Sequence, residues 1–436
     1  MTDRQIVIGG FGAAGAATAL ALVSGGVAPG EILIFDPGVP GNNQPLATAK
    51  SPDGGRSLPK NASNPGIPDS RIADSRILAL NAGSRRFLEA LGAWERLSHA
   101  AFPMRSMAIS DTALEEAFRP RLLDIGAADE AEPLAHLVPL PLLTASLRDL
   151  CREAGVALVN GRLAAFKAEA SAILVEIAGQ GGAPETISAR LLIGADGAQS
   201  PIRMKAGIPT HGWMYGQTAI VATIRHSLAH HGEAVQHFLP SGPFALLPLD
   251  EFRSSIVWSE TSAAAEAILA ADSEAQRSAI AARAAGWRGD ILAVEAISSH
   301  PLQLRLARRF VGERLALVAD AAHVVHPLAG QGLNLGFEDA AMLAELIVER
   351  LRLGLDPGAP DLLETYQARR RPAAVAMAYA TEGINRLFSN DASPLRILRD
   401  IGAGIIDRLP GAKQSLIRAA SGQTGLSPRL FRGEAI

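Results

Sequence analysis

The sequence of 436 residues contains a single cysteine, Cys151, which excludes an intramolecular disulfide framework and a cysteine-rich metal cluster. It also lacks a basic excess, because 41 Lys and Arg stand against 44 Asp and Glu, and a nucleic-acid-binding protein should show a basic stripe. No stretch of about 18 residues is continuously apolar, so we expect no membrane-spanning helix. The first residues, MTDRQIVIGG, lack the features of a signal peptide, and we therefore expect a cytoplasmic protein.

The composition that remains is that of an ordinary globular protein, with 48% hydrophobic and 19% charged residues. A chain of 436 residues exceeds one average domain, so two or three structural parts are expected.

The first chemical motif is a glycine-rich turn near the start of the chain. Gly10, Gly12 and Gly15 form G-x-G-x-x-G between an apolar strand over residues 5–8 and an alanine-rich helix. A second strand, EILIFD, ends at Asp36, which lies 21 residues after Gly15 and suits an acid that holds a ribose hydroxyl. Strand, glycines, helix, strand and acid in this order predict a dinucleotide cradle, without choosing between FAD and NAD.

Residues 37–75 have a different character. Seven prolines fall in this segment among Gly, Asn and Ser, which predicts an irregular covering loop. Two interpretations are open at this point: a lid over a pocket, and a plain surface insertion.

The second motif is an aspartate followed by a glycine, Asp196 and Gly197, shortly after the apolar run ARLLIG. Cofactor contacts gather at the carboxyl ends of strands in open α/β sheets, although a turn aspartate that caps the next helix is the plainer interpretation. Ser200 and Pro201 are expected to begin that helix as N-cap and first helical residue.

Residues 208–300 read as strands separated by turns, without strand–helix alternation, and predict an inserted antiparallel sheet. Four histidines in this region, at positions 226, 230, 231 and 237, lack a carboxylate or cysteine at ligand spacing. We expect no metal site there.

The third motif begins where the strand RLALVAD ends at Asp320 and a long helix follows. The turn between them contains His323 and His326. A metal site lacks a third ligand here, and a Ser-His-Asp triad lacks its G-x-S-x-G elbow. The remaining interpretation is the wall of a pocket, formed by Pro327 and by Gly330, Gln331, Gly332 and Asn334 at the helix entry.

Together the motifs resemble the FAD-dependent aromatic hydroxylases of the para-hydroxybenzoate hydroxylase fold. The general resemblance rests on the glycines of residues 10–15, on GADGAQSPIR at 194–203 and on DAAHVVHPLAGQGLNLGFEDA at 320–340. Less distinctive segments resemble the ubiquinone-biosynthesis hydroxylases within this family. They are DSRILAL near residue 74, GPFALLPL at 242–249 and RLPGAKQSL at 408–416. Two features depart from the family: Ala319 stands where the family usually has glycine, and the proline-rich insertion is unusual.

This resemblance implies a Rossmann-like FAD-binding domain, an inserted, mostly antiparallel substrate domain and C-terminal helices. The implied FAD-binding domain is discontinuous, over residues 1–101, 136–207 and 301–352. The implied substrate domain covers 102–135 and 208–300, and a C-terminal helical region covers 353–436.

The resemblance also assigns roles to individual residues. Asp320 would hydrogen-bond the ribityl chain, and the turn from Gly330 to Asn334 would surround the pyrimidine edge of the flavin. Asp196 and Gly197 would help to hold FAD. Arg76 is either a further FAD contact or a surface ion pair. His323 is expected to support the site by hydrogen bonding, and no catalytic base is assigned.

The implied reaction is hydroxylation of an aromatic ring, in which NAD(P)H reduces FAD and dioxygen forms a flavin hydroperoxide. The chain has one dinucleotide fingerprint, so NAD(P)H is expected to bind transiently. The expected substrate is a polyprenylated phenol of ubiquinone biosynthesis. A prenyl-chain reductase of similar fold and a non-catalytic FAD-bearing scaffold of a biosynthetic complex are the alternatives, whereas the Trp-x-Trp-x-Ile-Pro signature of a flavin halogenase is absent.

Residues 386–418 carry six Lys and Arg against three Asp, interleaved with apolar side chains. This pattern is typical of a basic amphipathic segment that rests on a membrane surface, and packing of the apolar faces on the core is the plainer interpretation. Peripheral contact with the inner face of the membrane is therefore an open expectation.

Overall fold

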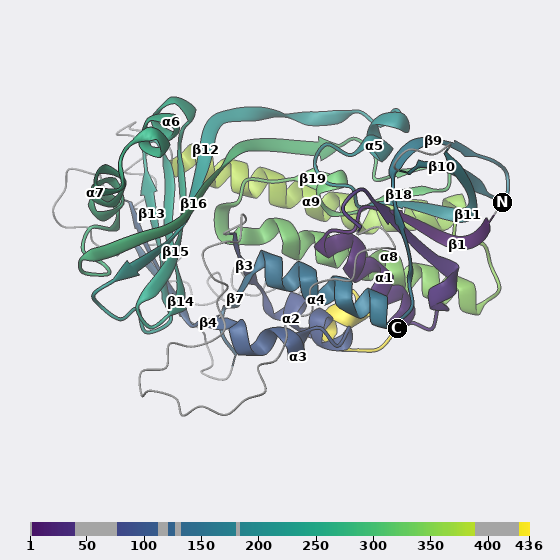
Figure 1. Ribbon diagram of the computed structural model, residues 1–436, viewed down its shortest axis with the longest axis horizontal. Coiled ribbons are helices and arrows are strands. Elements are labelled where there is room, and N and C mark those ends of the chain that lie inside the picture. Colours follow the sequence, from purple (N-terminus) through teal and green to yellow (C-terminus); the bar gives the residue numbers. More distant parts are fainter. Residues whose placement is uncertain (1, 40–75, 112–120, 127–131, 180–183, 389–426) are drawn as a thin grey trace.

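The computed structural model describes residues 2–39, 76–111, 121–126, 132–179, 184–388 and 427–436, and Figure 1 shows how they are arranged. Two eight-stranded sheets lie at opposite ends of the molecule, and a three-stranded sheet lies between the helices and the second large sheet. We call the part built on the first sheet the cofactor lobe and the part built on the second sheet the distal lobe.

The sheet of the cofactor lobe has a parallel centre in the order β18–β11–β1–β2–β8. Its strands are β1 (Thr2–Gly9), β2 (Ile32–Asp36), β8 (Ala157–Asn160), β9 (Arg162–Ala168), β10 (Ile173–Ala178), β11 (Glu185–Gly194), β17 (Val311–Gly312) and β18 (Leu315–Leu317). The central strands read as almost continuous apolar runs, as expected for a parallel sheet covered on both faces.

The sheet of the distal lobe is antiparallel except where β13 pairs with β5. Its order is β19 (His323–Val324), β16 (Ile291–Ala307), β12 (Thr210–His226), β15 (Arg253–Thr261), β14 (Gly242–Asp250), β13 (Glu233–Leu239), β5 (Ser106–Asp111) and β6 (Leu123–Gly126). The long strands β12 and β16 run from one lobe to the other (Figure 1).

The third sheet has the order β3 (Ile77–Leu80), β7 (Ala135–Pro139), β4 (Phe102–Met104). The helices are α1 (Ala13–Ser24), α2 (Ala82–Ala90), α3 (Trp94–Leu97), α4 (Leu140–Glu153), α5 (Pro201–Lys205), α6 (Ser262–Ala270), α7 (Ser273–Ala284), α8 (Gln331–Arg352) and α9 (Pro360–Phe388). Short 3-10 turns are η1 (Pro29–Glu31), η2 (Ser98–Ala100), η3 (Ala319–Ala321), η4 (Leu328–Gly330) and η5 (Arg429–Arg432).

Helix α1 lies at the centre of the cofactor lobe, in contact with α4 and α8. Its residues from Ala13 to Leu22 are all buried, so no polar stripe faces water. The many alanines of this helix let its neighbours approach closely, and they place its N-terminus directly after the glycine-rich turn.

The predicted α/β fold with an inserted, mostly antiparallel sheet is confirmed. The predicted domain boundaries stay an interpretation, which the joining of β5 and β6 to the distal sheet supports. The two helices of that region, α6 and α7, were not expected from the strand-rich reading of residues 208–300.

From residue 40 onwards the proline-rich segment lies outside the described residues, as does most of the basic segment 386–418. In the described part of the chain, no helix is long and apolar enough to cross a membrane.

Candidate functional site

Four neighbouring strands of the parallel sheet end at the same edge. Gly9 of β1 pairs with Gly194 of β11 and with Phe35 of β2, while Gly194 also pairs with Leu317 of β18. The last residue of β2 is Asp36, and the loops that follow β1, β11 and β18 carry Gly10, Asp196 and Asp320. The sheet therefore gathers, at one edge, four predicted cofactor positions that lie up to 310 residues apart in the sequence (320 − 10).

The glycine-rich turn is shaped by close approaches of the backbone. Gly10 has a φ of +104°, and a Cβ on it would lie 2.3 Å from the Ala195 carbonyl oxygen. A Cβ on Gly15 would lie 2.1 Å from the Gly10 carbonyl oxygen, so the helix packs closely against the turn. Gly12, the N-cap of α1, has no atom within 4 Å of its Cβ position and leaves open space at the helix N-terminus. The geometry fits a pyrophosphate cradle.

Asp36 connects the end of β2 to this turn. One carboxylate oxygen accepts the Phe11 amide at 2.9 Å, and the other accepts the Gly38 amide at 2.6 Å. The Phe11 carbonyl accepts the Arg148 Nε at 2.5 Å from α4. Arg148 was not among the predicted site residues, because no local motif marks an arginine 137 residues away as a partner of the turn.

Asp196 caps the next helix, as the plainer interpretation predicts, and keeps one carboxylate oxygen without a partner in the described chain. One carboxylate oxygen accepts the Ile202 amide at 3.0 Å and so caps α5, together with Ser200, whose hydroxyl accepts the Arg203 amide at 2.9 Å. The other oxygen, Oδ1, is buried and has no hydrogen-bond partner in the described chain. Burial raises the pKa of Asp196 despite these hydrogen bonds. A buried acceptor without a partner at the cofactor edge fits a ligand that donates a hydrogen bond.

Arg203 joins the second and third motifs. Its buried guanidinium donates to the Ala321 carbonyl at 2.8 Å and to the Ala198 carbonyl at 3.0 Å. The loop of Asp196 and the loop of Asp320 are therefore held together by one side chain. Arg203 could not be identified from the sequence. The run SPIR at residues 200–203 indicates the start of a helix, but it does not indicate a partner 118 residues away.

Asp320 lies in η3, directly after β18. Its side chain is exposed, yet desolvation by the surrounding protein raises its pKa, opposed by the charges of His323 and Arg76. A carboxylate that is exposed and yet closely surrounded by protein atoms lies in a hollow of the protein surface. Arg76 is exposed at the start of β3 and lies near enough to Asp320 to act on its charge. Both residues therefore border the same hollow.

Beneath Asp320 lies a fully buried ion network centred on Asp339 of α8. Its carboxylate accepts the Ala319 amide at 3.1 Å, His323 Nε2 at 2.6 Å and Arg370 Nε at 2.7 Å. Arg370 also pairs with Glu338 at 2.9 Å. Burial alone would raise the pKa of Asp339, but His323 and Arg370 outweigh it and hold the pKa below its usual value. His323 thus supports the turn, as expected for a structural hydrogen bonder.

The start of α8 is shaped by Gly330, which has a φ of +65° and contributes no side-chain cap. Gln331 and Gly332 are half-buried in the first turn, and the position of a Cβ on Gly332 is open. The unsatisfied amides of a helix N-terminus carry partial positive charge toward the hollow. Pro327 precedes this turn as the N-cap residue of η4.

Asn334 has protein partners for both ends of its amide. Its oxygen accepts the Asn81 amide at 3.1 Å and the Ser84 hydroxyl at 2.7 Å, and its nitrogen donates to the Ala79 carbonyl at 2.8 Å. Asn334 therefore fixes α8 to the β3–α2 connection. A direct contact of Asn334 with the cofactor stays a prediction, and the geometry favours a positioning role.

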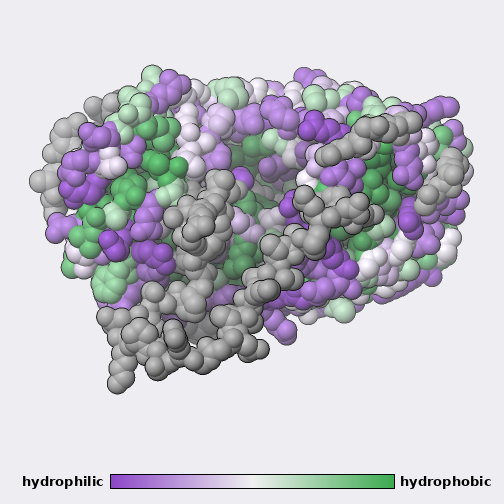
Figure 2. Space-filling model, viewed as in Figure 1, coloured by the Kyte–Doolittle hydropathy of each residue, from purple (hydrophilic) through white to green (hydrophobic). Residues whose placement is uncertain are grey.

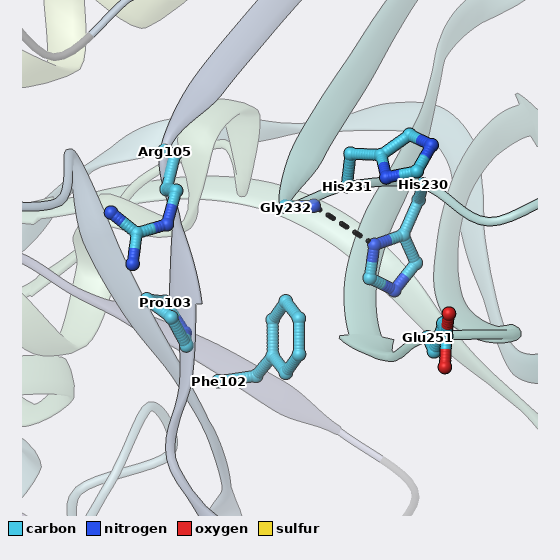
Figure 3. A pocket seen from close by; sticks show the side chains of 7 residues that line it. All are labelled: Phe102, Pro103, Arg105, His230, His231, Gly232 and Glu251. Carbon is cyan, nitrogen blue, oxygen red and sulfur yellow. Dashed lines mark hydrogen bonds between the residues drawn. The ribbon is translucent and has the colours of Figure 1, made fainter. Parts of the chain in front are cut away.

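The hollow shown in Figure 3 lies elsewhere, between β4 and the turn before β13. It has a volume of about 290 Å³, and its lining includes Phe102, Arg105, His230, His231 and Glu251. His230 Nδ1 accepts the Gly232 amide at 3.1 Å, and burial lowers the His230 pKa to about 4. None of the lining residues belongs to the cofactor edge. In the described residues, no group of three His, Cys, Asp or Glu could hold a metal ion.

Comparison with known proteins places this geometry in a family. A family model described as an FAD binding domain matches residues 69–381. The chain is 39% identical over 365 residues to ubiquinone hydroxylase UbiL of Rhodospirillum rubrum, with 83% of each chain covered. It is 32% identical over 362 residues to 3-demethoxyubiquinol 3-hydroxylase of Escherichia coli, with 82% of this chain and 90% of that protein covered.

Among solved structures, p-nitrophenol 4-monooxygenase PnpA from Pseudomonas putida matches with a TM-score of 0.71, covering 97% of this chain and 100% of that one. At 17% identity this likeness shows a shared fold. The glycine cradle, the unpartnered oxygen of Asp196 and the position of Asp320 fit FAD as the resident cofactor. The chain therefore belongs to the FAD-dependent aromatic hydroxylases, in the family of ubiquinone-biosynthesis monooxygenases.

Proposed function

We propose that this enzyme hydroxylates the aromatic ring of a polyprenylated phenol in ubiquinone biosynthesis, with NAD(P)H as transient reductant and dioxygen as the oxygen source. The observation that carries the proposal is the cofactor edge itself, where loops after β1, β2, β11 and β18 converge on one hollow. The names of the relatives, a ubiquinone hydroxylase and a 3-demethoxyubiquinol 3-hydroxylase, support the substrate class.

Different residues of the chain would bind different parts of FAD. The amides at the start of α1 would bind the pyrophosphate, and Asp36 would bind the ribose near it. Asp320 would accept a hydrogen bond from the ribityl chain, and Asp196 Oδ1 would accept another hydrogen bond from the cofactor. When bound, FAD supplies the redox chemistry that activates dioxygen, and the protein supplies orientation and a dry pocket.

The N-terminus of α8 contributes electrostatics to the same hollow. Its first-turn amides and the helix dipole favour negative charge at the site they face. Because the Cβ position of Gly332 is open, a ring system can approach the backbone of the first turn there. The negative charge on reduced flavin would be stabilised by this helix end.

Peripheral membrane contact and assembly into a biosynthetic complex are further parts of the proposal. A polyprenylated substrate is very apolar, and the basic segment 386–418 is suited to an anionic lipid surface. The test is flotation of the full chain with vesicles of phosphatidylglycerol and phosphatidylethanolamine, with phosphatidylcholine vesicles as the control. Equal flotation with both, or none, would remove the membrane part of the proposal.

The activity is tested with purified holoenzyme, NADH or NADPH, oxygen and a short-chain prenylated phenol. We expect the phenol to accelerate NAD(P)H oxidation and mass spectrometry to show a product one oxygen atom heavier. Saturation of a chain double bond would instead indicate a prenyl-chain reductase. Tight FAD binding without turnover of any prenylated phenol would indicate a non-catalytic scaffold.

A further inference from the structure

Three polar side chains lie close together beside the turn that leads into α8, without completing their hydrogen bonds. His326 is 0% exposed and Glu382 is 6% exposed, and the hydroxyl of Tyr215 is also shielded from solvent. Within the described chain, both ring nitrogens of His326, the Tyr215 hydroxyl and Glu382 Oε2 have no hydrogen-bond partner. Unpaired buried polar atoms are costly, so such a cluster calls for an explanation.

The fold brings these residues together from three elements. The rings of Tyr215 and His326 meet edge to face, with centroids 5.1 Å apart. Tyr215 packs in a small apolar cluster with Ala378, which lies one turn before Glu382 on α9. Burial raises the pKa of Tyr215, and the nearby Glu382 carboxylate raises it further through hydrogen bonding and charge. The two groups lie close together but outside the geometry of an ordinary hydrogen bond.

An irregularity in the pairing of β12 with β16 directs Tyr215 toward His326. The register of β12 against β16 shifts between Met214 and Thr218, so three residues of β12 have no partner on β16 there. Gly216 within this bulge has a φ of +69°. Bulges of this kind redirect a side chain and are frequent beside active sites. The Tyr215 ring remains half-buried, so its outer edge borders open space while its hydroxyl points inward.

His326 connects the cluster to the cofactor site. It directly precedes Pro327 and the η4 turn that leads into α8, and it follows β19, which pairs with β16. Figure 2 shows a recess between the two lobes, with apolar residues at its floor. Pro327 and η4, which follow His326, belong to the predicted wall of the cofactor site, so a substrate held beside the cofactor would lie near His326.

We propose that His326 and Tyr215, with Glu382 behind them, form the hydrogen-bonding end of the substrate pocket and bind a hydroxyl group on the aromatic ring. The inference rests on the proposed function. Tyr215 can donate to Glu382 Oε2, since Arg386 already pairs with Oε1. That leaves an acceptor on the tyrosine oxygen, and a donor and an acceptor on the histidine ring. A hydroxyl group on the substrate ring can both donate and accept a hydrogen bond, whereas a methyl ether or a quinone carbonyl can only accept one.

Binding by neutral groups is favoured over proton transfer to His326. Burial lowers the His326 pKa to about 4, so the ring is neutral near pH 7. A phenol ordinarily has a pKa of about 10, and a gap of about six units disfavours proton transfer by about a million-fold. His326 and Tyr215 therefore act as specificity residues, and Glu382 acts as a positioning residue through Tyr215.

The test compares two probes on the purified holoenzyme, 2-farnesylphenol and its methyl ether, by their dissociation constants from flavin spectral changes. We expect the wild type to bind the phenol about 10-fold more tightly than the ether, because the ether leaves buried acceptors unpaired. Tyr215→Phe and His326→Gln should bring this ratio close to one, mainly by weakening phenol binding. Glu382→Gln should lower the ratio less, and Tyr379→Phe on the exposed side of α9 should leave it unchanged.

A wild-type ratio near one would overturn the inference, because the cluster would then not recognise a ring hydroxyl. An unchanged ratio in Tyr215→Phe and His326→Gln, with normal flavin occupancy, would overturn it as well. Because Tyr215→Phe removes a single oxygen atom, it keeps the test valid if His326→Gln fails to fold. Absence of hydroxylated product in the wild type contradicts the proposed function instead, and the binding ratio still reports on the pocket.

Discussion

The Cβ of Ala319 occupies the space that a side chain on Gly336 would need, since a Cβ on Gly336 would lie 2.6 Å from it. Ala319 has a φ of 53°, the left-handed region that favours glycine. The alanine at this position is therefore tolerated because α8 has a glycine opposite it, and because the Ala319 amide is held by Asp339.

The contact between Ala319 and Gly336 predicts that a substitution at one of these positions can compensate a substitution at the other. Gly336→Ala should destabilise the protein by about 1–3 kcal/mol, because neither backbone can move away easily. Ala319→Gly should recover a large part of this loss, since the nearest remaining atom would be the Cα of residue 319 at 3.2 Å. Urea unfolding of the four proteins measures the coupling. Gly383→Ala, on α9 with open space around it, is the control and should be neutral or slightly stabilising. Additive effects of the two substitutions would contradict the steric account.

The glycine turn predicts a separation of folding from cofactor binding. Gly10→Ala should lower the stability of the apoprotein, because the new Cβ would clash with the Ala195 carbonyl in a left-handed backbone. Gly12→Ala should leave apoprotein stability nearly unchanged, yet weaken FAD by about 10-fold or more, since the cofactor has to approach that backbone. Thermal unfolding of the apoproteins and flavin titration measure the two effects. Equal FAD affinity in Gly12→Ala and the wild type would argue against a pyrophosphate at this turn.

The buried network around Asp339 predicts a loss of stability in acid. Its folded-state pKa lies below the unfolded value of about 3.9, so its contribution is complete above that value and is lost as pH falls through the folded pKa. Asp339→Asn should cost about 3 kcal/mol at pH 7, because it leaves His323 and Arg370 with a weaker partner. Urea unfolding from pH 6 to pH 3 should show a shallower acid decline in the variant. Glu364→Gln, an exposed substitution on α9, is the control and should behave as the wild type.

The hollow around Asp320 predicts a trade-off between stability and cofactor affinity. The pKa of Asp320 is raised in the folded protein. The contribution of this group to stability is therefore greatest below its pKa in the unfolded chain, and it is lost as pH rises through its pKa in the folded protein. Asp320→Asn removes this penalty and should stabilise the apoprotein at pH 7 while weakening FAD binding. Glu349→Gln, on the exposed face of α8, should change neither. A variant that lost stability and kept its FAD affinity would show that Asp320 serves the fold and not the cofactor.

The elements that could be predicted from the sequence are those whose cause is local. Gly10 to Gly15 and Ser200–Pro201 are turn and cap signals that act over a few residues, and the structure places both as expected. Asp36, Asp196 and Asp320 could be grouped because parallel strands end at one edge. Ala319 could be identified as a departure from the resemblance, but its explanation needed Gly336 beside it.

The features that could not be predicted depend on contacts between distant segments. Arg203 reaches Ala321, and Arg370 reaches Asp339 from the next helix along the chain. The role of Asn334 became visible through its bonds to the β3–α2 connection. Helices α6 and α7 are rich in alanine with a weak apolar pattern, which is why their segment could not be distinguished from the neighbouring strands.

The strands β12 and β16 are each 17 residues long, and they form a continuous ribbon from the cofactor lobe into the distal lobe. A ribbon of this length resists shear and stretching, because either would break a whole ladder of hydrogen bonds. The β12–β16 ladder is irregular at three places, and the widest irregularity, between Met214 and Thr218, leaves β12 locally free of its partner β16. Any change in the angle between the two lobes at this point of the ribbon would therefore change the orientation of Tyr215 as well.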